Sequence, residues 1–470
     1  MERVFTDQQM REVFADAGDF IARELHCGKM LLWAYSIDGL TSGADTSRFV
    51  FKPIANSLRG GSMEELYQRA LHGTIYNNVA SACKDLRDAA LKLVNGFCVV
   101  LFPGVGAIAF EVKTGDKRNP AAPALENTVK GPKDAFVETI RTNTSLVRRH
   151  LRTPDLRLWQ TTVGRRSITN VSVAWVDGIT NSELVERMKQ RITSIDIDAL
   201  LSPSAVEEYI TGSRATAFPL LQYTERADTF CRGLLDGRVG VLVDGLPLGY
   251  LAPTDLGYLM QSPEDRSRDY MSATCVKLLR WTALLIDLLL PGLYVAMAMH
   301  HSNLLFPELR NTVMGGIEQI PFSPGGEAVA MLIAFELLQE SGIHLPQSIG
   351  QSVSTIGGIV VGSAAVEAGL ISPVALIAVS IAGVCGFVLP NRDVANAVRF
   401  WRFGITLAAW AAGLAGLGAA FAVLVIHLLG LRSMGIPYVM VRKNELVRQR
   451  LKNQKKRNEK LSPKDEKNQK

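Results

Sequence analysis

The sequence has few of the residues that build disulfide scaffolds and metal sites. Its 470 residues include six cysteines, scattered without CxxC spacing, and seven histidines. We interpret the cysteines as reduced core residues, because disulfide scaffolds and zinc sites use cysteines at short, regular spacings. No metal or other cofactor is therefore expected.

Motifs of the common catalytic and nucleotide-binding sites are absent as well. The chain has no GxxxxGK[ST], HExxH or GxSxG sequence. The Gly-Val-Gly sequence at 104–106 is short and lies in a predicted hairpin turn, and His26, His72 and His150 each stand alone. We therefore expect neither enzyme activity nor nucleic-acid binding. A binding or assembly role fits the first half of the chain better.

Charge is scarce in one part of the chain. Only 20% of the residues are charged, with a net charge of +6, but residues 1–280 carry charges throughout, whereas Leu, Ile, Val, Ala and Gly dominate 281–431. Residues 1–25 contain no apolar run, so no secretory signal is expected and the first half should stay in the cytosol. The pattern predicts a soluble head followed by a helical membrane region.

A repeated pattern indicates two related subdomains in the head. Leu93-Val94-Asn95-Gly96 precedes apolar runs at 97–102 and 107–112, and Leu234-Leu235-Asp236-Gly237 precedes similar runs at 238–243 and 248–251. Each copy reads as a helix end, a glycine stop and a β-hairpin. Upstream, each has a buried strand that ends in Asp-Gly. We predict two α/β subdomains at about 29–113 and 170–252, although one α/β domain with two similar hairpins stays open.

The predicted fold class is thus an α/β cytosolic head of two similar subdomains plus an α-helical multi-pass membrane domain. In chain order we expect an N-terminal helical segment (1–28), a first α/β subdomain and linker (29–130), a connecting helix (131–169) that starts near Pro132, a second α/β subdomain (170–275), a helical membrane domain (276–438) and a basic cytosolic tail (439–470).

Four or five apolar segments can be drawn in the membrane region, at 281–299, 328–343, 352–370, 374–389 and 404–431. A cytosolic head and a basic, cytosolic tail require an even number of crossings by the positive-inside rule. In the simplest arrangement all segments except the second span the membrane. This arrangement would place Arg392, Arg399 and Arg402 on the far side, which argues against it.

Acidic residues in the membrane region are the candidates for a functional site. Glu336, Glu340 and His344 are spaced i, i+4, i+8, so they share one helix face. Glu367 lies late in the third segment, and Asp287 lies inside the first. Charges in membrane helices usually face a cavity or a partner, so Asp287, Glu336, Glu340 and Glu367 are candidate ion-path residues. Alternatively, the second segment is an interfacial amphipathic helix, and Asp287 and Glu367 pair with neighbouring helices.

Motifs between about residues 20 and 438 resemble the GerA-type spore germination protein A-subunit family. In the head these are Gly131-Pro132-Lys133, Ala135-Phe136-Val137-Glu138, Thr142-Asn143, Arg148-Arg149, Thr224-Glu225-Arg226, Asp228, Gly237-Arg238-Val239 and Ser262-Pro263-Glu264-Asp265. In the membrane region they include Pro291-Gly292-Leu293-Tyr294, Pro321-Phe322, Glu327-Ala328, Phe335-Glu336-Leu337-Leu338, Leu345-Pro346 and Ser372-Pro373. Arg266 and Ser267 depart from the pattern, since the family commonly has two aromatics there.

The resemblance implies an A subunit of a spore nutrient germinant receptor in the inner spore membrane, with head and tail on the cytosolic, spore-core side. It implies a homo-oligomeric ring in lipid that works with B and C subunits and releases monovalent cations at germination. An accessory germination ion channel of the same family and a non-conducting membrane scaffold are the alternatives.

Overall fold

The structure is a computed structural model that describes residues 5–56, 62–72, 79–113, 123, 126, 131–200, 202–212, 216–317, 320–344 and 362–439. These residues form two compact units. We call them the head unit (5–212 and 221–253) and the helical unit (216–220 and 254–439). The predicted basic tail lies outside the described residues, apart from its first residue.

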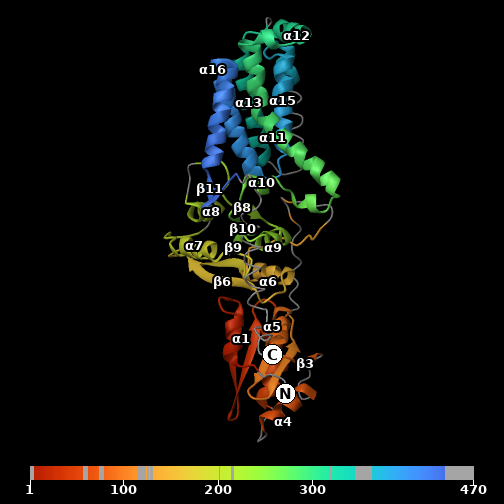
Figure 1. The fold of residues 1–470 in the computed structure, drawn as a ribbon, viewed down its shortest axis with the longest axis vertical. Coiled ribbons are helices and arrows are strands. Elements are labelled where there is room, and N and C mark those ends of the chain that lie inside the picture. Colours follow the sequence, from red (N-terminus) through yellow and green to blue (C-terminus); the bar gives the residue numbers. More distant parts are fainter. Residues whose placement is uncertain are drawn as a thin grey trace, which may run out of the picture. The chain divides into compact units, whose positions relative to one another are not determined.

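The first half of the head unit is a five-stranded antiparallel sheet with helices on both faces (Figure 1). Its elements are α1 (Asp7–Val13), β1 (Phe20–Cys27), β2 (Met30–Ile37), α2 (Gly43–Asp45), η1 (Thr46–Phe51), α3 (Lys52–Asn56), α4 (Met63–His72), β3 (Ala80–Ala82), α5 (Leu86–Val94), β4 (Phe97–Phe102) and β5 (Gly106–Glu111). Val99 and Leu101 of β4 pack toward α1 and α5, whereas Val100 and Phe102 pack toward α3 and α4. Successive strand side chains alternate between faces, so a strand buried on both sides is apolar throughout.

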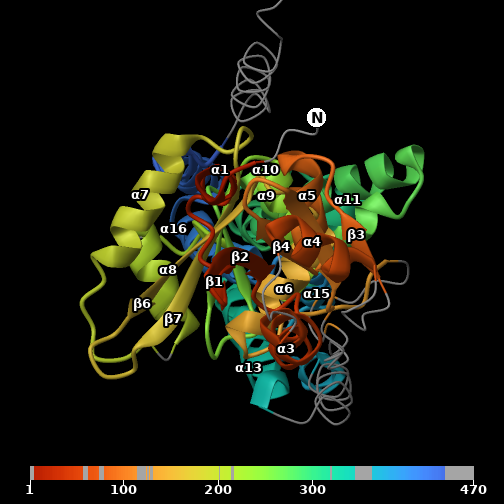
Figure 2. The ribbon, with the colours of Figure 1, turned by 90° about the horizontal axis from the view of Figure 1, so that it is seen from below.

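The second half of the head unit repeats this arrangement. Its elements are α6 (Ile140–His150), β6 (Leu156–Val163), β7 (Thr169–Val176), α7 (Ser182–Thr193), α8 (Pro203–Thr211), β8 (Gln222–Thr224), α9 (Ala227–Leu235), β9 (Val239–Val243) and β10 (Gly249–Ala252). The strand order is β6-β7-β9-β10-β8, which matches β1-β2-β4-β5-β3 position by position. Helices α6 and α9 pack on one face, and α7 contacts β6, β7 and β9 (Figure 2). The predicted duplication is therefore confirmed at the level of topology.

The glycine that follows the helix has the same role in both copies. Gly96 after α5 and Gly237 after α9 have φ of +86° and +91°. This left-handed conformation strains any residue with a Cβ, so glycine ends the helix there and turns the chain into the hairpin.

Three boundaries in the head differ from the sequence prediction. Residues 1–28 are not one helical segment, because 20–27 form edge strand β1, which pairs with β2. The connecting helix does not start near Pro132, because Ala135 bridges Arg226 and Phe136 donates its amide to the Glu225 carbonyl, which keeps this stretch extended. Helix α6 begins only at Ile140, and 156–163 form strand β6.

A buried ion pair joins the two subdomains. The Arg148 guanidinium on α6 donates to both carboxylate oxygens of Asp19, each at 2.7 Å, and also to the Leu156 carbonyl at 2.9 Å. Arg148 is 0% and Asp19 3% exposed. Next to this pair, the Gly18 amide donates to the Leu158 carbonyl of β6. The subdomains are thus fixed to each other by buried polar contacts.

The helical unit contains the apolar segments. Its elements are α10 (Leu256–Leu259), η2 (Pro263–Arg266), α11 (Tyr270–Met299), η3 (Ser302–Leu304), α12 (Pro307–Ile317), α13 (Pro324–His344), α15 (Pro373–Phe387), α16 (Arg392–Gly430), β11 (Arg432–Ser433) and β12 (Ile436–Pro437). Among the described residues, α11 and α16 are long and apolar enough to cross a membrane, and α15 is a shorter apolar helix. Most of the predicted third segment, 352–370, lies outside the described residues.

Helix α16 is not one straight span but two antiparallel arms (Figure 1). Ala412 (φ −137°, ψ 18°) and Gly413 (φ +60°, ψ −140°) leave the helical region and form the turn. The Trp401 and His427 rings lie 5.6 Å apart, although a straight helix would separate them by about 39 Å. We call residues 392–411 the first arm and 414–430 the second arm. The predicted fifth segment, 404–431, therefore does not cross as a single helix.

The hairpin also determines where the arginines of the first arm lie in the helical unit. The start of the first arm lies beside the end of the second arm, and Val394 packs in one cluster with Leu424 and with Leu256 and Leu259 of α10. Residue 254 is where the chain enters the helical unit. Arg392 thus lies near the end of the helical unit at which the chain enters it, and Arg399 and Arg402 follow further along the first arm.

Candidate functional site

Asp287 of α11 is bound to an arginine from the first arm of α16. Arg402 donates from Nη1 to Asp287 Oδ1 at 2.5 Å, and the exposed fractions of the two residues are 1% and 0%. Helix α15 passes this carboxylate at Gly386, where a Cβ would lie 3.1 Å from Oδ2. The structure thus gives Asp287 the helix-pairing role that the sequence left open.

Glu336 of α13 has a second arginine of the same arm as its partner. Arg399 donates from Nη1 to Glu336 Oε1 at 3.0 Å and also contacts the side-chain oxygens of Gln339 and Asn396. The side chains of Arg399 and Glu336 are 20% and 42% exposed. We call these two ion pairs, which link α11 and α13 to α16, the charged layer.

Some polar atoms of the charged layer have no hydrogen-bond partner among the described residues. They are Asp287 Oδ2, Arg402 Nε and Glu336 Oε2. Leaving such atoms unsatisfied in an apolar environment is costly. The described residues thus leave part of the hydrogen-bonding capacity of the charged layer unused.

The other two predicted ion-path residues lie outside the charged layer. Glu340 on α13 and Glu367 are both exposed and belong to neither ion pair. The side chain of His344, predicted on the same face as Glu336 and Glu340, lies outside the described residues.

Sequence reasoning missed a buried carboxylate at the start of α13. Glu327 is 1% exposed and accepts hydrogen bonds from the Tyr294 hydroxyl, from the Ser372 amide at 2.8 Å and from the Ser372 hydroxyl at 3.0 Å. Because these donors come from α11 and from the N-cap of α15, the carboxylate ties three helices together. An acidic residue before an apolar run reads as an ordinary first-turn residue, so only its place in the family motif Glu327-Ala328 could have pointed to it.

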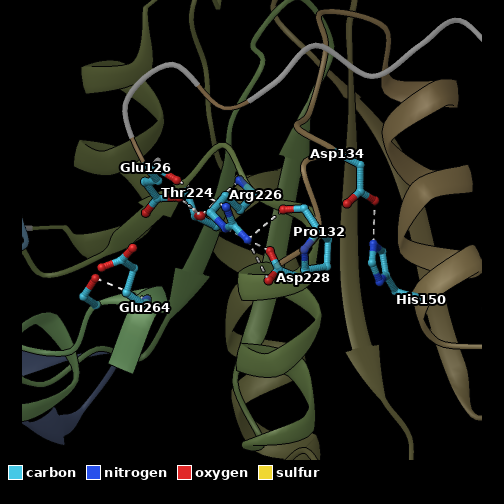
Figure 3. Close-up of polar contacts among 9 residues, drawn as sticks. Glu126, Pro132, Asp134, His150, Thr224, Arg226, Asp228 and Glu264 are labelled. Atoms are coloured by element: carbon cyan, nitrogen blue, oxygen red, sulfur yellow. Dashed lines mark hydrogen bonds and ion pairs between the residues drawn. The ribbon is translucent and has the colours of Figure 1, made fainter. Parts of the chain in front are cut away.

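In the head unit, Arg226 holds the linker between the subdomains (Figure 3). Its guanidinium donates to the carbonyls of Glu126 (3.3 Å) and Pro132 (3.0 Å) and to both carboxylate oxygens of Asp228 (3.1 and 3.0 Å). Thr224 donates to the Glu126 carboxylate. Arg226 is 1% exposed. We call this group the linker clamp; a buried guanidinium needs such a set of acceptors to offset its desolvation.

In the part of the chain that the structure describes, no cluster of three or more His, Cys, Asp or Glu side chains could hold a metal ion. The six cysteines are free; four are buried, Cys385 is half-buried and Cys275 is exposed.

The model of the Bacillus/Clostridium GerA spore germination protein family matches residues 8–460. The chain belongs to this family. The match covers both units, so the resemblance inferred from the motifs is confirmed.

Several proteins of Bacillus subtilis (strain 168) are similar to the chain over most of its length. The uncharacterized membrane protein YfkQ is 33% identical over 423 residues, which are 90% of this chain and 82% of that protein. Spore germination protein B1 is 32% identical over 86% of this chain and 83% of its own length. Spore germination protein KA is 30% identical over 92% of this chain and 80% of its own length. These relatives support a role in spore germination and, together with α11 and α16, a membrane location.

A solved structure is similar to the first part of the chain. It is the N-terminal domain of the A subunit of the Bacillus megaterium spore germinant receptor GerK3, with 26% identity over 52% of this chain and 92% of that one, and a TM-score of 0.41.

The linker clamp explains a motif that carried the family resemblance. In Thr224-Glu225-Arg226, the threonine binds the Glu126 side chain, the Glu225 carboxylate accepts the Glu126 amide at 2.7 Å, and the arginine binds the linker carbonyls. Asp228 then neutralises the guanidinium from the first turn of α9. The motif thus fixes the linker to the second subdomain.

Two groups of this region hold protons more tightly in the folded chain. Burial, together with the nearby Glu225 charge, raises the pKa of Glu126 from its usual 4.5 to about 7. His150 bonds Asp134 at 2.6 Å, and this bond raises the pKa of His150 above its usual 6.5 (Figure 3). Both groups bind more protons in the folded than in the unfolded state, so the stability of the head falls as pH rises.

We therefore expect the full chain in detergent to be less stable toward heat at about pH 8 than at about pH 5. The stability that Glu126 contributes is lost between pH 4.5 and about pH 7, and the contribution of His150 begins to be lost near pH 6.5. In the double variant E126Q/H150Q, the thermal midpoint should depend less on pH over this range than in the parent. H26Q changes an exposed histidine and should leave this pH dependence unchanged. If the thermal midpoint of E126Q/H150Q falls with pH as steeply as that of the parent, other groups control the pH dependence.

Proposed function

We propose that the chain is an A subunit of a spore nutrient germinant receptor, and that it forms an oligomeric membrane channel that releases monovalent cations at germination. The observation that carries the proposal is the family match across both units. Names of relatives, such as spore germination proteins B1 and KA, support it. B and C subunits would be its partners, and the inner spore membrane its location.

Several copies are needed for a channel of this kind. The carboxylates of the charged layer are occupied by arginines of the same chain, so one copy offers few polar groups for a water path. Helix α15 exposes Ile377, Ile381 and Val384 at i, i+4, i+7, an apolar stripe suited to lipid or to a neighbouring copy. In a closed ring, the exposed Glu340 would become a circle of carboxylates that attracts cations and repels anions.

The proposed topology places the head and the tail on the same, cytosolic side. The hairpin of α16 supports it, because Arg392 and Arg432 then flank two apolar arms from one side, as the positive-inside rule requires. Accessibility labelling of a cysteine at the last residue and of one in the head tests this; opposite labelling patterns would rule it out.

The channel proposal is tested with the purified full chain in liposomes. Replacing Glu336 and Glu340 together by glutamine keeps side-chain shape and removes two charges near the proposed path. We expect the selectivity for potassium over chloride to fall roughly tenfold, because a ring of carboxylates concentrates cations locally. Native mass spectrometry of the same samples reports whether the oligomer forms.

The matched control is E308Q, which removes an exposed carboxylate of α12 in the same helical unit. It should leave flux and selectivity unchanged. If E336Q/E340Q assembles and selects like the parent, the pore lies elsewhere. If the parent itself forms only monomers and conducts no ions, the channel proposal fails and a non-conducting scaffold remains.

A further inference from the structure

We infer that Glu336, Gln339 and Asn396 form a binding site for a monovalent cation, and that Arg399 closes it by occupying it as a tethered cation. The inference rests on the proposed channel function and adds to it the regulation of one site. It starts from the two ion pairs of the charged layer, which differ in burial.

The two pairs differ in how easily they can open. In the Asp287–Arg402 pair both side chains are almost fully buried, at 0% and 2% exposure, so separating them would leave two uncompensated charges away from water. In the Glu336–Arg399 pair the exposed fractions are 42% and 20%, so both groups lie partly at the surface of the helical unit and are not enclosed by it when they separate. The first pair is therefore a permanent structural contact, and the second is the one able to open.

The groups around Arg399 are those that a small cation binds. Its guanidinium contacts one carboxylate oxygen and two amide oxygens, from Glu336 on α13, Gln339 on α13 and Asn396 on α16. Potassium and sodium are coordinated by oxygens of this kind, with the carboxylate supplying the charge. A cation and the guanidinium cannot occupy these oxygens together, so they compete.

A second observation points to a ligand at the same place. Glu336 Oε2 is buried and has no hydrogen-bond partner among the described residues, although Oε1 binds Arg399. The guanidinium thus satisfies only half of the carboxylate. A hydrated cation in place of Arg399 would satisfy both oxygens.

Removing the tethered charge should open the site. In liposomes that hold the full chain, we expect R399Q to raise potassium flux roughly threefold to tenfold over the parent, since a half-exposed pair contributes a modest closing energy. R399K keeps a tethered cation and should stay near the parent. The matched control is R392Q, the same substitution about two turns earlier on the same arm, and it should change nothing.

A second measurement does not depend on conduction. The thermal midpoint of R399Q should be higher in potassium chloride than in N-methyl-D-glucamine chloride at equal ionic strength, because potassium binds the vacated site. The parent and E336Q/R399Q should show no such difference. If R399Q conducts like the parent and shows no potassium-dependent midpoint, the inference is overturned, while the effect of E336Q/E340Q on selectivity still decides the channel proposal. If R399Q shows the midpoint shift but no variant conducts, the site stands and the channel fails.

Discussion

The variant D287N is expected to lose most of its correctly folded protein. Asparagine leaves the Arg402 guanidinium charged, 1% exposed and without its carboxylate among the apolar helices. Removing one partner of a buried ion pair costs about 3–5 kcal/mol, and little water is available within the helical unit to reduce this cost. The yield of monodisperse protein in size-exclusion chromatography and its thermal midpoint in mild detergent measure the loss.

Two further variants make this expectation specific. D287N/R402Q removes both charges and leaves two neutral groups able to hydrogen-bond, so it should recover much of the yield. E367Q changes an exposed carboxylate of the same helical unit and should behave like the parent. A D287N protein as stable as the parent would show that Arg402 has another source of compensation.

The second large effect is expected at the subdomain junction. D19N leaves the Arg148 guanidinium buried without an opposing charge, and its remaining acceptors are the asparagine amide oxygen and the Leu156 carbonyl, at 2.9 Å in the parent. A cost of about 3–5 kcal/mol would make local opening more than about a hundredfold more frequent. Hydrogen exchange of the full chain should then rise in α6 and β1 and remain slow in β4 and β9, which lie in the two cores.

Two control variants test whether the buried Asp19–Arg148 pair is responsible. D196N breaks the Arg165–Asp196 pair, whose side chains are 68% and 66% exposed, and should leave exchange unchanged. D19L/R148M replaces the buried charges with apolar groups and should restore part of the protection, limited by the Leu156 carbonyl that loses its donor. Equal exchange in D19N and the parent would contradict a fastening role for the junction.

The parts of the fold that the sequence predicted are those with local signals. Both hairpins could be placed because a glycine stop, two apolar runs and a turn follow one another within about twenty residues. Strand β1 was missed because Arg23, Glu24 and His26 give this edge strand a polar, helix-like composition. The α16 turn was missed because an Ala-Gly pair is ordinary inside a membrane helix.

The candidate site was predictable only in part, for a similar reason. Asp287 and Glu336 could be identified because a carboxylate among apolar residues is rare. Their partners could not, because Arg402 and Arg399 lie 115 and 63 residues further along the chain, and nothing local links them. Long-range pairing depends on how the helices pack, which a single sequence does not specify.

The hairpin of α16 also determines how this part of the chain can be inserted into a bilayer during synthesis. Its tip at Ala412 and Gly413 carries no charged side chain, and His300 binds the Trp410 carbonyl next to it. In the proposed topology the two arms therefore enter the lipid together, tip first, while Arg392 and Arg432 stay with the headgroups on the side of entry. No hydrophilic loop has to cross the bilayer between the two arms. Insertion of the hairpin therefore requires only backbone and apolar groups to enter the lipid at its tip.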